Sequence, residues 1–244
     1  MLSDIPAFFG LGTPGEMNWA HGVNSSTALD AYLSDADTHV IEADISWLPE
    51  AGGVMMAHPP ASTSDLTFEA WIEAVAGGGK GAKLDFKHPA VVDPCLAKLT
   101  SMRAAGRLAI PIMLNADVLP GPGGDPSLFQ AAGFIARCGA FREAVLSLGW
   151  TTGPVAGGSY SEAMALDMLR LAAPVDGRVT VCLRAAPIAA SSGAVARLQA
   201  APGAWITVWN GRADPLVTPA EARRLTDPRR SFYDLIDAQG HPLR

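Results

Sequence analysis

The sequence predicts an α/β fold, a single-domain (β/α)8 TIM barrel that spans residues 1–244. Short apolar runs alternate with helix-like segments along the chain, an order that is typical of parallel α/β folds. Eight such runs favour a closed barrel over an open, doubly wound sheet. The glycine-rich stretch at 77–81 precedes a strand and does not join a strand to a helix, so it indicates a helix end and a turn rather than a nucleotide-binding loop.

The individual elements follow from apolar runs and from capping residues. Several expected helices begin after a residue that caps helix N-termini: Ser25 or Ser26, Thr67, and Asp125 followed by Pro126. We expect strands near 16–21, 38–45, 53–58, 81–87, 109–115, 145–150, 178–184 and 204–209. We expect helices near 26–36, 66–76, 89–106, 126–140, 159–173, 189–200 and 218–225.

Composition excludes several classes of protein. The chain is 49% hydrophobic and 17% charged, which is typical of a globular protein, and its net charge of −6 with no basic run argues against nucleic-acid binding. It has no apolar run of the roughly 18 residues that a transmembrane segment needs. Cys95, Cys138 and Cys182 are widely spaced among apolar residues, so we expect packing thiols and a cytoplasmic location. Nothing in the sequence sets the oligomeric state.

One strand carries an unusual charge pattern. Lys83, Asp85 and Lys87 alternate with Leu84 and Phe86. Because successive side chains of a strand point to opposite faces, the three charges share one face and the apolar residues share the other. In a strand that is buried on both faces, such charges must pair with one another or hold an ion.

Acidic residues gather where the expected barrel strands end. Functional residues of such barrels lie at the C-terminal ends of the strands. The second strand ends in Glu42 and Asp44, which share a face, and the fourth contains Asp85. Three carboxylates suit a hard cation, so we expect these three residues to hold one Mg²⁺ or Ca²⁺. The alternative is that Glu42 and Asp44 pair with Lys83 and Lys87 in a buried ion network.

Two histidines flank this acidic group in the sequence pattern. His21 follows the first expected strand and His58 ends the third. Because imidazole titrates near neutral pH, a facing pair can serve as general base and general acid, although each histidine alone could also be structural. Lys83 and Lys87 add positive charge that suits a phosphate-bearing substrate. Three further residues at strand ends either line the pocket or only cap a loop or cover the core: Asn115, Arg184 and Trp209.

Six sequence blocks closely resemble the menorin family, in order and over nearly the whole chain. They are Trp19-Ala20-His21-Gly22-Val23-Asn24, Ile41-Glu42-Ala43-Asp44, Ala57-His58-Pro59-Pro60, Lys83-Leu84-Asp85-Phe86-Lys87, Leu114-Asn115-Ala116-Asp117-Val118-Leu119-Pro120-Gly121-Pro122 and Leu148-Gly149-Trp150-Thr151-Thr152.

That family in turn resembles a branch of the barrel-shaped phosphodiesterases, which include glycerophosphodiester phosphodiesterases and sphingomyelinase D-like enzymes. Their pattern of His, Glu-x-Asp, His and acid-x-Lys on the first four strands is matched here by His21, Glu42 with Asp44, His58, and Asp85 with Lys87. The chain departs from the pattern in three places. It has no Arg after the first histidine, no Asp after the second, and Asp instead of Glu on the fourth strand.

The expected function is therefore that of a metal-dependent phosphodiesterase, a hydrolase acting on a glycerophosphodiester, a lysophospholipid or a related small phosphodiester. The resemblance implies that a neighbouring hydroxyl of the substrate can be the nucleophile, which would release a cyclic phosphate first. The alternative is a barrel that binds a phosphate or a lipid headgroup without turnover. A sugar hydrolase needs two carboxylates on facing strands, whereas Glu42 and Asp44 lie on the same strand.

Overall fold

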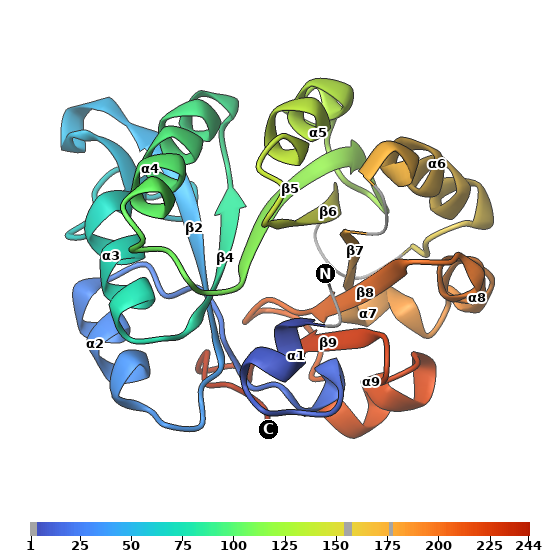
Figure 1. Ribbon diagram of the computed structural model, residues 1–244. Coiled ribbons are helices and arrows are strands. Elements are labelled where there is room, and N and C mark those ends of the chain that lie inside the picture. The colour runs from blue at the N-terminus through green and yellow to red at the C-terminus, as the bar shows by residue number, and fades with distance from the viewer. Residues whose placement is uncertain (1–3, 154–157, 176–177) are drawn as a thin grey trace.

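The computed structural model describes residues 4–153, 158–175 and 178–244, and within them eight parallel strands form a nearly closed barrel with helices outside it (Figure 1). Hydrogen-bonded ladders join each strand to the next, and the last strand lies beside the first. The predicted fold class is confirmed. The strands, in their order around the barrel, are β1 (Trp19–Ala20), β2 (Val40–Leu48), β4 (Gly81–Phe86), β5 (Ile112–Pro120), β6 (Val145–Thr151), β7 (Val179–Arg184), β8 (Ala204–Trp209) and β9 (Ser231–Asp234).

The strand expected near 53–58 is present, but the expectation that it is the third strand of the barrel was wrong. β3 (Gly53–Met56) pairs antiparallel with the end of β2, in a register that runs from Ile45 opposite Met56 to Leu48 opposite Gly53. Only the short 3₁₀ turn Pro49–Ala51 and Gly52 separate the two strands. Such a connection suits a hairpin, because a parallel neighbour needs a crossover of about a dozen residues. The eighth barrel strand is β9, which the sequence patterns did not predict.

The expected helices are present, with shifted boundaries. The side chains of Ser25 and Thr67 accept hydrogen bonds from the backbone N–H groups of Ala28 and Ala70, as predicted for N-caps. The prediction that Asp125-Pro126 caps the next helix was wrong, because that helix begins only at Ala131. The helices that cover the barrel are α2 (Ser26–Ser34), α3 (Phe68–Gly77), α4 (Val92–Ala104), α5 (Ala131–Gly139), α6 (Glu162–Ala172), α8 (Ser192–Ala200) and α9 (Pro219–Leu225), with shorter α1 (Asp4–Phe8) and α7 (Ala185–Ile188).

The glycine-rich stretch at 77–81 is the helix end and turn that the sequence indicated. Helix α3 ends at Gly77, Gly79 has a φ of 67°, and β4 begins at Gly81. A left-handed backbone of this kind favours glycine and stops a helix. The stretch therefore connects α3 to the strand that carries Asp85.

Two apolar layers surround a polar barrel interior. The larger core fills the space between the sheet and the helices and includes Trp71, Phe86 and Phe134. The smaller core closes the N-terminal end of the barrel, where Trp19 and Phe232 pack with a ring-centroid distance of 5.6 Å. Above that layer the interior side chains are mostly polar, and those of Glu42, Asp44, Lys83 and Asn115 are buried.

Two other expectations can be compared with the described residues. Cys95, Cys138 and Cys182 are buried free thiols, as predicted. Among the described helices, none combines the length and the hydropathy that crossing a membrane requires.

Candidate functional site

A cavity of about 740 Å³ opens at the C-terminal ends of the barrel strands. Most of the residues predicted for the site line this cavity, and Glu42 lies beneath it, almost fully buried. The lining residues from the predicted set are His21, Asp44, His58, Lys83, Asp85, Lys87, Asn115, Arg184 and Trp209.

The register of β2 against β4 brings the three predicted acids together. Glu42 pairs with Lys83 and Asp44 pairs with Asp85 in a parallel ladder, so side chains that share the inner face are neighbours. One oxygen of each of Glu42, Asp44 and Asp85 lies within 4.8 Å of the others. Glu42 Oε1 is buried and has no hydrogen-bond partner among the described residues. Three converging carboxylate oxygens fit a hard divalent cation.

Lys87 binds two of these acids in the structure. Its Nζ lies 3.0 Å from Asp44 Oδ1 and 2.6 Å from Asp85 Oδ2. Burial alone raises the pKa of Asp44, but Lys87, His58 and a hydrogen bond from Asn24 outweigh it and lower the pKa to about 2. Asn24 Nδ2 donates that bond to Asp44 Oδ2 at 2.7 Å. Of the alternative ion network, the structure has the pair of Asp44 with Lys87, whereas Lys83 pairs with Asp234 and not with Glu42.

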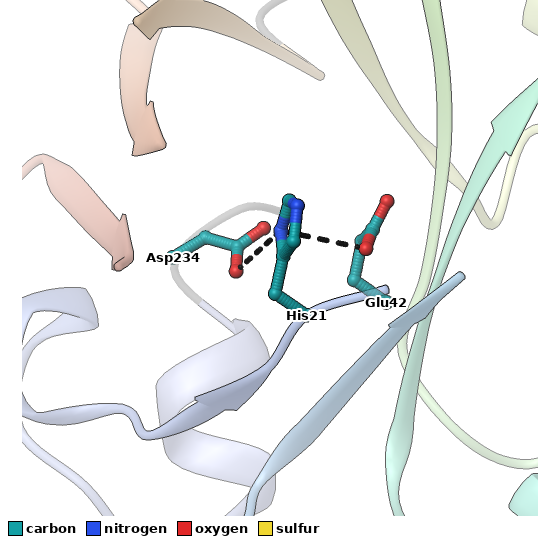
Figure 2. Close-up of side chains that lie close together, drawn as sticks. All are labelled: His21, Glu42 and Asp234. Carbon is teal, nitrogen blue, oxygen red and sulfur yellow. Dashed lines mark ion pairs between the residues drawn. The ribbon is translucent and has the colours of Figure 1, made fainter. Parts of the chain in front are cut away.

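His21 lies between two buried carboxylates (Figure 2). Its Nδ1 is 3.1 Å from Asp234 Oδ1 and 3.5 Å from Glu42 Oε2, although neither contact has the alignment of a hydrogen bond. The backbone explains the position, because the N–H of Gly22 donates to Glu42 Oε2 at 2.7 Å and the N–H of Val23 donates to the carbonyl of Glu42. The end of β1 is thereby held against β2.

The charges of His21, Glu42 and Asp234 depend on one another. Burial lowers the pKa of His21, but Asp234 and then Glu42 raise it more, to about 9. Burial raises the pKa of Glu42 despite the opposing effect of His21. The pKa of Asp234 falls to about 2, because His21 and Lys83 outweigh the effect of its burial. At neutral pH, His21 is therefore an imidazolium held by an ionised Asp234.

Lys83 lies deeper in the barrel than Lys87. It is 3% exposed, and its Nζ is 3.2 Å from Asp234 Oδ2 and 5.9 Å from the centre of the Trp19 ring. Its burial lowers its pKa, whereas Asp234 and the other nearby carboxylates raise it more strongly. Lys83 thus neutralises Asp234 from below while His21 contacts it from above.

His58 reaches the cavity from the chain that follows the β2–β3 hairpin, not from a barrel strand. The side chain is exposed. Two bonds fix the segment before it: the N–H of Ala57 donates to the carbonyl of Asp44 at 2.9 Å, and Ser46 Oγ donates to the carbonyl of Ala57 at 2.7 Å. His58 therefore lines the same cavity as His21 from the neighbouring side of the acidic group.

Asn115 orients one of the predicted metal ligands. Its Nδ2 donates to Asp85 Oδ1 at 2.7 Å, and its Oδ1 accepts from Cys182 Sγ at 3.1 Å. Burial raises the pKa of the Cys182 thiol to about 11, so it acts as a donor and not as a thiolate. Asn115 is thus locked between Asp85 and the opposite wall of the barrel.

Arg184 and Trp209 form the other side of the cavity. Arg184 is bound to Asp214 through Nε at 2.8 Å and Nη2 at 2.5 Å, and its Nη1 donates to Thr152 Oγ1 at 3.1 Å. The guanidinium lies 5.5 Å from the centre of the Trp209 ring, and that ring is parallel to His21 at a centroid distance of 6.5 Å.

The sequence patterns missed two residues that belong to this site. Asp234 was missed because β9 is only four residues long, although the run Ser231–Asp234 before Leu235 has the residue types of a short strand. Asp117 lines the cavity, and burial together with Asp85 raises its pKa to about 7. A Cβ at Gly149 would lie 2.2 Å from Asp117 Oδ1, so the glycine makes room for this carboxyl group.

Comparisons with known proteins identify the family of the chain. The model of the menorin N-terminal domain matches residues 15–240 of the chain. The human protein FAM151B is 32% identical over 240 residues, which cover 94% of this chain and 86% of the relative. No solved structure matches the chain.

Proposed function

Because the chain belongs to the menorin family and carries an acidic cluster at the mouth of a parallel barrel, we propose that it is a metal-dependent phosphodiesterase. The proposed substrates are small phosphodiesters such as a glycerophosphodiester or a lysophospholipid. The resemblance of the sequence motifs to those of barrel-shaped phosphodiesterases supports this function.

One observation carries the proposal: the oxygens of Glu42, Asp44 and Asp85 converge within 4.8 Å, and His21 lies beside Glu42. These three residues would hold one Mg²⁺ or Ca²⁺. When bound there, the cation would neutralise the carboxylates and stabilise negative charge on a phosphate oxygen.

The two histidines would divide the proton transfers. His21, with a pKa of about 9, is protonated at neutral pH and suits the general acid that protonates the leaving alcohol. Asp234 would position its ring and stabilise its charge. His58 lines the same cavity and suits the general base that deprotonates the nucleophile, which is either water or a neighbouring hydroxyl of the substrate.

The lysines would balance the charge of the phosphate. Lys87 lies in the cavity wall and would exchange its carboxylate partners, Asp44 and Asp85, for a phosphate oxygen. Lys83 lines the cavity but is only 3% exposed and pairs with Asp234, which it would keep ionised. Asn115, Arg184 and Trp209 would shape the pocket around the substrate.

The direct test is an activity assay with a panel of glycerophosphodiesters and lysophospholipids, with Mg²⁺, with Ca²⁺ and with EDTA. His21→Ala is expected to lower kcat by about 100-fold or more, because a positioned proton donor contributes about that much. His241→Ala is the matched control, since His241 is 73% exposed, pairs with Asp237 and does not line the cavity. Equal turnover by the wild type and His21→Ala would reject the proposed role.

Cation binding is tested separately by thermal unfolding. Mg²⁺ or Ca²⁺ is expected to raise the Tm of the wild type, because a ligand of the folded state stabilises by about 2.7 kcal/mol at a concentration 100 times its Kd. Asp85→Asn is expected to remove most of this rise, and Asp93→Asn, at an exposed acid on α4, is expected to keep it. A Tm that no divalent cation changes would refute the metal site.

The ion pairs of Lys87 favour a second candidate, a barrel that binds phosphate without turnover. In that protein Lys87 would remain with Asp44 and Asp85 and would serve as a permanent substitute for a cation. Thermal stabilisation by a phosphodiester that is recovered intact after incubation would identify this alternative.

A further inference from the structure

The cations of the cavity differ in whether they are already paired. Within the described residues, the Lys and Arg side chains that line it are Lys83, Lys87, Arg184 and Arg212. Each of the first three lies 3.2 Å or less from a carboxylate oxygen. Arg212 is exposed at the mouth and makes no hydrogen bond or ion pair with a described residue. It is therefore the lining cation whose charge is available to an incoming anion.

The turn that carries Arg212 is pinned to the barrel. Asp214 Oδ2 accepts from the N–H of Gly211 at 3.0 Å, and the N–H of Asp214 donates to the carbonyl of Gly211 at 3.0 Å. The same carboxylate is bound by Arg184 from the end of β7, and its side chain is fully buried. The backbone on either side of Arg212 is thus held in one conformation, which places this side chain at the cavity.

The C-terminal turn provides the space that the guanidinium occupies. A Cβ at Gly240 would lie 2.5 Å from Arg212 Nε and 2.8 Å from its Cζ, and Gly240 has a φ of 88°. Asn210 joins the two turns, because its side chain exchanges two hydrogen bonds with the backbone of Ile236, at 2.9 and 2.8 Å. Only glycine at position 240 leaves the guanidinium where it is.

We propose that Arg212 binds a phosphate group of the ligand at the mouth of this cavity. Arginine presents a planar fork of N–H donors that matches phosphate oxygens. The other three cations already bind a carboxylate, whereas Arg212 has no carboxylate partner among the described residues. The identity of the anion as phosphate rests on the proposed function, and Arg184 becomes the positioning residue that fixes the turn.

Isothermal titration calorimetry in EDTA tests this inference without requiring turnover. Inorganic phosphate and lysophosphatidylcholine are titrated separately into the wild type, Arg212→Gln and Arg224→Gln, so that the two titrations distinguish free phosphate from a lipid headgroup. Arg212→Gln is expected to weaken binding by about tenfold or more, as expected for loss of a charged hydrogen bond. Arg224→Gln is expected to bind as the wild type does, because Arg224 is exposed on α9 and does not line the cavity.

Unchanged affinity in Arg212→Gln, equal losses in both variants, or a wild type that binds neither compound would overturn the inference. An unaltered Tm of Arg212→Gln would exclude unfolding as the cause of a loss. The activity assay separates this inference from the proposed function. Binding that depends on Arg212 without turnover rejects the phosphodiesterase alone, whereas turnover with the same kcat and KM in Arg212→Gln rejects the role of Arg212 alone.

Discussion

Asp234 controls the charge of a residue from the opposite end of the chain. Its carboxylate lies 3.1 Å from His21 Nδ1 and 3.2 Å from Lys83 Nζ, and its side chain is completely buried. In such surroundings a carboxylate remains ionised only because two cations contact it. The same contacts keep His21 protonated at neutral pH.

Replacing Asp234 by Asn is therefore expected to lower the pKa of His21 from about 9 by about one unit or more, because the carboxylate that raises this pKa most strongly is removed. The measurement is an NMR titration of the histidine ring protons in metal-free protein. Asp237→Asn is the control, because Asp237 contacts the exposed His241 and not His21. A His21 pKa that is the same in Asp234→Asn and in the wild type would contradict the assignment.

The same pair contributes a pH-dependent part of the stability. The pKa of His21 is higher in the folded protein than its ordinary value of 6.5, so its contribution is fully present below pH 6.5 and is lost as the pH rises through about 9. Urea unfolding of the wild type between pH 6 and pH 10 is expected to show this loss. Asp234→Asn is expected to show a smaller loss of stability over this pH range. The same pH dependence in both proteins would contradict the contribution of the His21–Asp234 pair.

At the scale of the element, the β2–β3 hairpin replaces a barrel strand and carries His58 to the cavity. β2 continues beyond the barrel, and β3 returns along it, so the chain reaches the mouth without a crossover helix. The return is tied at its end by Ser46 Oγ, which donates to the carbonyl of Ala57 at 2.7 Å inside the protein. The position of His58 thus depends on the hairpin rather than on the barrel.

Ser46→Ala is expected to destabilise the protein by about 1–3 kcal/mol, because the buried carbonyl of Ala57 loses its side-chain donor. If His58 is the general base, kcat is also expected to fall, while the pKa of His21 stays near 9. Urea denaturation and the activity assay measure the two effects. Ser34→Ala, which removes an exposed hydroxyl bond to Asp30 on α2, is expected to change neither by a comparable amount.

At the scale of the whole molecule, β9 makes the barrel nearly closed and completes the site at once. Phe232 is fully buried and packs on Trp19 and Trp205, each at a ring-centroid distance of 5.6 Å. Two positions later the same strand places Asp234 beside His21, which directly follows β1. Stability of the barrel and charge of the site are therefore coupled through one short strand.

Phe232→Ala is expected to lower the free energy of unfolding by about 3–5 kcal/mol, as is usual for a large aromatic removed from a core. Phe8→Ala, at a residue that is 47% exposed, is expected to cost much less. Urea denaturation of both variants measures the difference. If both variants lost the same small amount of stability, β9 would not be the closing strand that the packing indicates.

The sequence by itself determined the fold class and most of the residues that meet at the cavity. The alternation of Lys83, Asp85 and Lys87 with apolar residues requires one buried polar face, and parallel strands bring their C-terminal ends to one mouth. The grouping of Glu42, Asp44 and Asp85 follows from that periodicity and from the neighbouring positions of their strands.

Only the tertiary structure decided which charges pair. Local patterns do not encode contacts between distant segments, so neither Asp234 on the four-residue β9 nor the hairpin beneath His58 was predicted. The pairing of Lys83 with Asp234, and of Arg184 with Asp214, depends on register and closure around the whole barrel. The physical reason is that the energy of a Coulomb interaction depends on the distance between the two charges and on their burial. Both the distance and the burial are set only when the chain has folded.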